Sequence, residues 1–182
     1  MYNETGGLVN KPVRAAMKSR EEEAMRAITQ ITLDLSAIVN LKHIKDLALN
    51  KKIPLNSPTG FLHEQLLVNT AILSLCKWLE FYKSYRNIIP ETVIDHADKL
   101  NSDISKINPK SFRNAHIGHV LNKKTGKPLS GEEIAEAYKS IFGGNFKDFW
   151  KWLGEMNPNP NTVVSRMDVV RDAVRVLSPK NA

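Results

Sequence analysis

The stretch that decides the fold is TGFLHEQLLVNTAILSLCKWLEFYKSYRN, residues 59–87. Apolar residues recur in it at intervals of three and four, which is typical of an α-helix. They form two sides of that helix, one made of Leu62, Leu66, Leu73 and Cys76 and the other of Leu67, Ala71, Leu75, Trp78, Leu79 and Tyr82. A helix that is apolar around most of its circumference is typical of the middle of a bundle. The stretch therefore predicts a central helix packed among others.

A second long helix is predicted before this stretch, from about Lys18 to Asn50. Its apolar residues step by four and three along one stripe, Ala24, Ile28, Ile31, Leu35 and Ile38. Pro54 and the turn-forming residues 56–58 separate the two long helices. Residues 1–18 are expected to form a flexible N-terminal segment, because they include Gly6-Gly7 and no apolar stripe.

Shorter helices are predicted after residue 90, over residues 90–105, from 109 to about 120, and over 130–142, 146–155 and 162–177. Asn108 and Pro109 have the form of an N-cap followed by a first-turn proline, and Ser130 and Glu133 have the spacing of a capping box. The last helix carries the apolar stripe Val163, Met167, Val170, Val174 and Leu177. Strand patterns are absent. The sequence predicts an all-α helical bundle of about six or seven helices, in one domain over residues 19–178.

The composition fits one intracellular globular domain, with 42% hydrophobic and 25% charged residues among 182. The lone Cys76 excludes an intrachain disulfide, and its apolar surroundings predict a buried structural thiol in a reducing compartment. Residues 1–23 contain no apolar signal segment, and no stretch reaches the ~20 apolar residues of a membrane span. We therefore expect a cytoplasmic protein with no membrane partner.

Positive charge is concentrated in one segment of the chain. Residues 99–127 contain the basic residues Lys99, Lys106, Lys110, Arg113, Lys123, Lys124 and Lys127, and Asp103 as the one acid. This segment accounts for six of the seven net positive charges of the chain. Such a concentration suits an anionic partner such as nucleic acid, although a solvated basic face without a partner stays open as an alternative.

Cationic and titratable groups crowd together in residues 112–119, FRNAHIGH. At 100° per residue, Arg113, His116 and His119 share an arc of about 120° and about 9 Å of helix length. An imidazole can take a proton from a ribose 2′-hydroxyl or give one to a leaving oxygen. A guanidinium offers a permanent charge and paired donors to a pentacoordinate phosphate. These groups are the ones that RNA cleavage without a metal needs.

Other interpretations of these residues stay open. An arginine followed by a histidine at this range of spacings is expected roughly 0.7 times by chance in this chain, so spacing alone decides nothing. His116 and His119 also fit a solvated helix surface, or two ligands of a zinc site that lacks a recognisable third. The aromatic residues Phe142, Phe146, Phe149, Trp150 and Trp152 fit base stacking, but core packing is their commoner role.

The segment resembles the HEPN superfamily (higher eukaryotes and prokaryotes nucleotide-binding). Its members are all-α bundles with an arginine, usually followed by a polar residue, and a histidine, with four to six residues in all between the arginine and the histidine. The match here is Arg113-Asn114, then residues 115–118, then His119. It lies near the start of a late helix after two long ones, and the basic turn at 122–127 is similar to a loop of abortive-infection members. The resemblance covers about residues 20–140 in helix order and seven residues in motif.

The resemblance implies a HEPN-like domain that cleaves RNA to a 2′,3′-cyclic phosphate without a metal or other cofactor. It implies that His119 is the acid–base residue, that Arg113 binds the phosphate and that Asn114 orients the two. His116 falls outside the family spacing and receives no role. Gly118 departs from the pattern, because glycine costs about 1 kcal/mol inside a helix. Family members pair two motif helices, so a homodimer is expected.

RNA is therefore the expected partner, with Lys110, Lys123, Lys124 and Lys127 binding its phosphates. An antitoxin or regulatory protein is the second expected partner, in a toxin–antitoxin or phage-defence setting. The alternative function is a non-catalytic HEPN-like module that binds nucleic acid or protein. A third interpretation is an unrelated helical scaffold in which the motif is a chance match.

Overall fold

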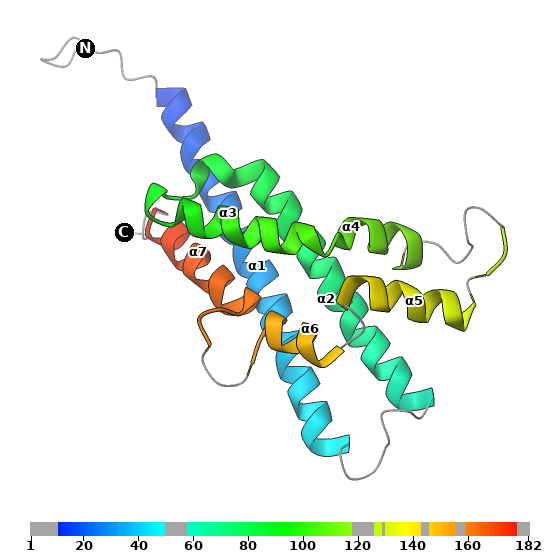
Figure 1. Ribbon diagram of the computed structural model, residues 1–182. Coiled ribbons are helices and arrows are strands. Elements are labelled where there is room, and N and C mark those ends of the chain that lie inside the picture. Colours follow the sequence, from blue (N-terminus) through cyan, green and yellow to red (C-terminus); the bar gives the residue numbers. More distant parts are fainter. Residues whose placement is uncertain are drawn as a thin grey trace, which may run out of the picture.

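The computed structural model describes residues 11–49, 58–117, 126–128, 130–142, 146–155 and 159–177. Its α-helices are α1 (Lys11–Leu49), α2 (Pro58–Tyr85), α3 (Glu91–Lys106), α4 (Pro109–Phe112), α5 (Gly131–Phe142), α6 (Phe146–Leu153) and α7 (Val163–Leu177). A 3-10 turn, Arg86–Ile88, follows α2, and a π-helical turn, Arg113–Ile117, follows α4. These ranges contain no β-strand, so the predicted all-α bundle is confirmed (Figure 1). None of the described helices has both the length and the apolarity that crossing a membrane requires.

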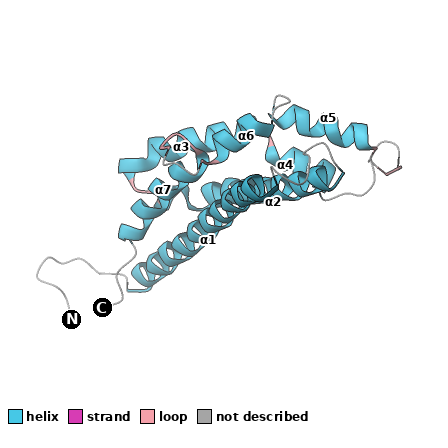
Figure 2. Cartoon of the chain, turned by 90° about the horizontal axis from the view of Figure 1, so that it is seen from below, coloured by secondary structure: helices cyan, strands magenta, loops and turns pink. Residues whose placement is uncertain are grey.

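The helices form two layers (Figure 2). The long helices α1 and α2 run antiparallel and make one layer, and α3, α5, α6 and α7 lie on one side of it. Helix α7 packs against both α1 and α3, and α2 contacts α3 and α4. The core lies between the two layers. No described helix covers the opposite side of the α1–α2 pair.

The predicted apolar stripes of the first and last helices are in the core. In α1 the five stripe residues Ala24, Ile28, Ile31, Leu35 and Ile38 are at most 4% exposed. In α7 the stripe is fully buried from Val163 to Val174, whereas Leu177 at the helix end is exposed. Helix α1 begins at Lys11, about seven residues before its predicted start. The apolar stripes identify which faces of the two helices lie in the core, but they do not predict where α1 begins.

Helix α2 differs from its prediction on one of its two apolar sides. Ala71, Leu75 and Trp78 of one side are fully buried, as expected. On the other side Leu62 and Leu66 are 61% and 65% exposed, and only Cys76 is buried among its members. The prediction that other helices surround α2 is therefore wrong for this second side, as far as the described helices of this chain are concerned. Periodicity reveals that a side is apolar, but it does not reveal what covers that side.

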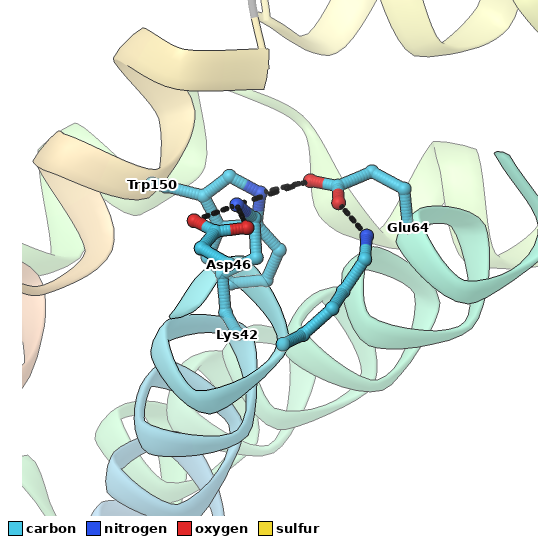
Figure 3. A network of polar contacts seen from close by, with 5 residues as sticks. Lys42, Asp46, Glu64 and Trp150 are labelled. Carbon is cyan, nitrogen blue, oxygen red and sulfur yellow. Dashed lines mark hydrogen bonds and ion pairs between the residues drawn. The ribbon is translucent and has the colours of Figure 1, made fainter. Parts of the chain in front are cut away.

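A buried polar cluster joins α1, α2 and α6 (Figure 3). The carboxylate of Glu64 accepts hydrogen bonds from Trp150 Nε1 and from Lys45 Nζ, both at 2.5 Å. The Nζ of Lys42 lies 2.6 Å from Asp46 and 4.0 Å from Glu64. It also lies 5.7 Å from the ring centroid of Trp150, within the range of a cation–π contact. Each charge of this Glu64 cluster has an opposite charge beside it, and the cluster fastens α6 to the long helices.

The start of α5 follows its prediction in detail. The backbone N–H of Ser130 donates to the Glu133 carboxylate at 2.7 Å, and the backbone N–H of Glu133 donates to Ser130 Oγ at 3.1 Å. These two reciprocal bonds are the capping box, so that prediction is confirmed.

Candidate functional site

The motif segment begins where the chain turns after α3. Asn108 has a left-handed backbone, with φ 48° and ψ 52°, and Pro109 takes the first position of α4. The predicted cap and proline positions are thus confirmed, although the Asn108 side chain makes no capping hydrogen bond. Asparagine is among the residues that tolerate this conformation best. Because Pro109 and Phe112 are buried, the short helix is anchored against α2.

Residues Arg113–Ile117 form a π-helical turn rather than a continuation of the α-helix. Such a turn closes hydrogen bonds over five residues instead of four and occurs frequently at functional sites. It changes the angles between side chains, so the arc calculated for an α-helix does not hold for Arg113 and His116. The two side chains in fact contact different neighbours.

Arg113 lies at the surface with 33% of its side chain exposed. Its Nη1 donates to Glu80 Oε1 of α2 at 3.3 Å, and its Nε donates to Asn114 Oδ1 at 3.2 Å. The side chain of Glu80 is 58% exposed, and ion pairs in such surroundings contribute about 0–1 kcal/mol. The guanidinium is therefore oriented by two long hydrogen bonds and stays accessible to an anion.

His116 packs towards the protein interior. Its ring centroid lies 5.0 Å from that of Phe112, and its Nδ1 is buried with no hydrogen-bond partner in the described part of the chain. Burial lowers the pKa of His116, and the negative charge of Glu133 opposes that shift. The lowered pKa favours the neutral imidazole at pH 7, and the ring packs on Phe112.

A hollow of about 450 Å³ lies between α2, α3 and α4. It is lined by Leu79, Tyr82, Lys83, Asn101, Ser105, Asn108, Pro109 and Lys110. Lys83 follows Glu80 by three residues and Lys110 precedes Arg113 by three, so both lysines lie about one turn from the ion pair. Within the described ranges neither lysine has an ion-pair partner. The hollow is of small-ligand size and has unneutralised positive charge on two of its walls.

The other residues predicted for the site fall in different parts of the chain. His119, Lys123 and Lys124 lie outside the described residues. Lys127 is described and exposed. The structure therefore brings together Arg113, its hydrogen-bond partner Asn114, and Lys110 one turn away.

The thiol of Cys76 lies close to this site, so the charges of Arg113, Glu80 and Lys110 affect its pKa. Its residue is 1% exposed, and burial raises the pKa of the thiol. The thiol is therefore protonated at neutral pH and is not a nucleophile. The predicted buried, structural cysteine is confirmed.

Sequence reasoning missed a polar cluster at the wall of the hollow. The hydroxyl of Tyr82 donates to Asp98, and Arg86 donates to the same carboxylate at 2.7 Å and to the hydroxyl at 2.9 Å. The hydrogen bond from Arg86 lowers the pKa of Asp98, and burial raises that of Tyr82. Their separations along the chain form no recognisable motif, so only the fold reveals that Tyr82 is held in place.

A second missed cluster lies between α3 and α7. Buried Arg166 donates to Asp103 at 2.9 Å, and Lys106 donates to the same carboxylate at 2.8 Å. One guanidinium nitrogen of Arg166 and Nε2 of His96 are buried with no hydrogen-bond partner among the described residues. The ion pair between Arg166 and Asp103 joins α7 to α3. Over the described ranges, no group of three or more His, Cys, Asp or Glu side chains could hold a metal ion.

Comparisons with known proteins add to the fold. The chain is similar to an integron cassette protein, Vpc_cass2, from the mobile metagenome of V. paracholerae. The TM-score is 0.68 with 23% identical residues, and the match covers 86% of this chain and 96% of the other. No protein-family model matches the sequence, and the search of curated proteins gives no match. The likeness establishes a shared helical bundle and leaves the activity to be argued from the site.

Proposed function

We propose that this chain is a metal-independent endoribonuclease of HEPN type. In this proposal Arg113 binds the scissile phosphate, Asn114 orients the guanidinium and His119 transfers protons. The observation that carries it is the partly exposed Arg113 side chain, whose guanidinium is held by one 3.3 Å contact to Glu80 and by Asn114. The arginine and asparagine of the motif thus interact directly at the surface.

The weak ion pair supports a phosphate-binding role for Arg113. An arginine locked to a buried carboxylate would have to break a strong pair before it could bind RNA. The solvated Glu80 carboxylate costs little to displace, and a phosphate offers the same guanidinium paired, charge-assisted hydrogen bonds. Lys110 and Lys83 add positive charge one turn away, where neighbouring phosphates of the RNA would lie.

The chemistry needs no group beyond those of the chain and the RNA. The ribose 2′-oxygen attacks phosphorus, the bond from phosphorus to the 5′-oxygen breaks, and a 2′,3′-cyclic phosphate forms. One imidazole removes the 2′ proton, and the leaving 5′-oxygen gains a proton from a second acid, for which the resemblance provides His119 of a second copy. Arg113 stabilises the charge that builds on the phosphate oxygens. RNA and an antitoxin or regulatory protein are the partners that this activity implies, in a toxin–antitoxin or phage-defence setting.

The test is cleavage of end-labelled RNA by purified protein in excess chelator. Wild type should cleave and leave cyclic phosphate ends. Arg113→Ala and His119→Ala should each lose at least ~100-fold in rate, the usual effect of removing one acid–base or charge-stabilising group. Arg26→Ala and His63→Ala, on exposed positions of α1 and α2, are the matched controls and should cleave normally. Absence of cleavage by wild type, or full activity of both motif variants, would reject the proposal.

The hollow favours one second candidate, a module that binds RNA without cleaving it. Lys83 and Lys110 line the hollow without help from His119. This function predicts RNA binding that survives His119→Ala, weakens in Lys83→Ala with Lys110→Ala, and falls as salt rises. Binding of that kind in a protein without cleavage activity would select this alternative.

A further inference from the structure

The last turns of α1 have their polarity reversed. Lys42 and Lys45 point inward to the Glu64 cluster, with side chains only 15% and 9% exposed. Figure 3 shows Lys42 beside Asp46 and Trp150. Leu41, Ile44 and Leu47 point outward and are 55%, 59% and 67% exposed. A helix of a solitary domain normally turns its leucines inward and its lysines to water. The reversal indicates that the outward side of this segment is covered by something else.

The neighbouring part of α2 also exposes apolar side chains. Leu62, Leu66 and Leu73 lie at intervals of four and seven residues, so they follow one line along the helix. They are 61%, 65% and 38% exposed. In residues 59–73 of α2 and 40–47 of α1, the one charged side chain that is more than a third exposed is Asp46, at 38%, and it pairs with Lys42 of the Glu64 cluster. In a chain with 25% charged residues, this is a large uncharged surface.

Two ion pairs set the register that makes these lines one surface. Lys45 of α1 pairs with Glu64 of α2 at 2.5 Å, and Asp34 pairs with Lys77 at 2.8 Å. In this antiparallel register, Ile44 lies level with Leu66 and Leu47 lies level with Leu62. The six exposed residues form the outer face of the α1–α2 pair: Leu41, Ile44, Leu47, Leu62, Leu66 and Leu73. It is the side that no described helix covers (Figure 2).

We propose that a second copy of this chain packs on the outer face, so that the α1–α2 pairs of two copies meet. The exposed parts of the six side chains equal three to four whole leucines, on the order of 600 Å² per copy. That area approaches the ~800 Å² that each partner contributes to a standard interface. Closed two-fold dimers, in which the same patch meets itself, are the commonest oligomers.

The charge pattern also fits a second copy. Each chain carries a net charge of +7, so two copies repel each other through most of their surfaces. The outer face brings no charged side chain against its own kind, and the core of an interface is characteristically depleted of charge. An uncharged face offers nothing to a nucleic acid phosphate. This contact is separate from the pairing of motif helices that the proposed cleavage of RNA uses, so the inference does not depend on that activity.

The direct test is the mass in solution over a dilution series that begins at about 50 µM, because interfaces of one size range from micromolar to picomolar affinity. Wild type should have at least twice the 20.5 kDa mass of one chain at the highest concentration. Ile44→Glu and Leu66→Glu should each raise the concentration of half-association at least tenfold, with an unchanged far-ultraviolet circular dichroism spectrum. Val176→Glu is the matched control, because Val176 is 85% exposed on α7, and it should stay dimeric.

A cross-link locates the interface without relying on a destabilising charge. Since Cys76 is 1% exposed, Ile44→Cys adds the one accessible thiol of the described residues. A short bismaleimide should join two copies of Ile44→Cys and should not join two copies of Val176→Cys. A monomeric wild type, or association that both glutamate variants leave unchanged, overturns the proposal. Association that the variants leave unchanged would place the contact on another surface, such as the motif helices. A monomeric wild type whose cellular activity the two variants abolish would assign the face to a different protein.

Discussion

Helix α2 carries two glutamates, Glu64 and Glu80, that differ in almost every physical respect. Glu64 is 9% exposed and accepts 2.5 Å hydrogen bonds from a lysine and a tryptophan. Glu80 has 58% of its side chain exposed and accepts one 3.3 Å bond from Arg113. A buried charge must be fully partnered or the fold loses stability, whereas an exposed pair can exchange partners at little cost. The difference separates a structural cluster from a surface that is available for binding.

The comparison predicts its largest effect for Glu64→Ala. This change leaves the ammonium of Lys45 and the indole N–H of Trp150 buried without their acceptor, so the free energy of unfolding should fall by about 3–5 kcal/mol. Urea unfolding followed by circular dichroism measures the loss. Glu136→Ala, which breaks an exposed pair with Lys139, is the control and should cost less than about 1 kcal/mol. Equal effects of the two changes would break the comparison.

Asp103→Asn should have the next largest effect, about 2 kcal/mol, because Arg166 loses its charged acceptor in the core. The hydrogen bond from Lys106, with that from Arg166, lowers the pKa of Asp103 below its usual value. A lowered pKa in the folded state gives stability that is present above the unfolded value near pH 4. It is lost as pH falls through the folded value. Urea unfolding at pH 7 and at pH 3 should therefore show a smaller gap between wild type and variant at pH 3; a constant gap would contradict this account.

The helices and much of the core could be predicted from local patterns. The stripe of α1, the capping box at Ser130 and the start of α4 all depend on residues close together in the chain. The partners of charged groups could not be predicted from local patterns, because Glu80 and Arg113, for example, are 33 residues apart in the chain. From the sequence, Lys42 and Lys45 would be assigned to a solvated face. Only the fold shows that Glu64 and Trp150 lie on their inner side.

The residues of the candidate site could be predicted from the sequence better than the backbone conformation that positions them. The adjacent Arg113 and Asn114 follow from the motif, and their direct hydrogen bond agrees with their assignment to one site. The π-helical turn was not predictable, because no residue pattern distinguishes it from an α-helical one. Its wider winding changes the angle between Arg113 and His116, for which an α-helix predicts a shared side.

His116→Leu should have a smaller effect that depends on pH. Burial lowers the pKa of His116 in the folded state, so below about pH 6.5 the unfolded chain binds a proton that the folded chain does not. Wild type therefore loses stability as pH falls from 7 to 5. The variant should lose less over the same range, by up to about 1 kcal/mol in urea unfolding. Identical losses in the two proteins would show that His116 accepts a proton without leaving its packed position.

Glu80→Gln should have the smallest effect on stability, about 0.5 kcal/mol or less, because the pair it breaks is solvated. Its informative effect is on RNA. Without the carboxylate, Arg113 loses a competitor for phosphate and the RNA loses a repelling charge, so binding at low salt should tighten a few-fold. Filter binding at two salt concentrations measures this, with Glu136→Gln as the control for removing a negative charge elsewhere. Weaker binding by Glu80→Gln alone would mean that Glu80 holds Arg113 in its binding position, and the contrast with Glu64 would then be one of degree.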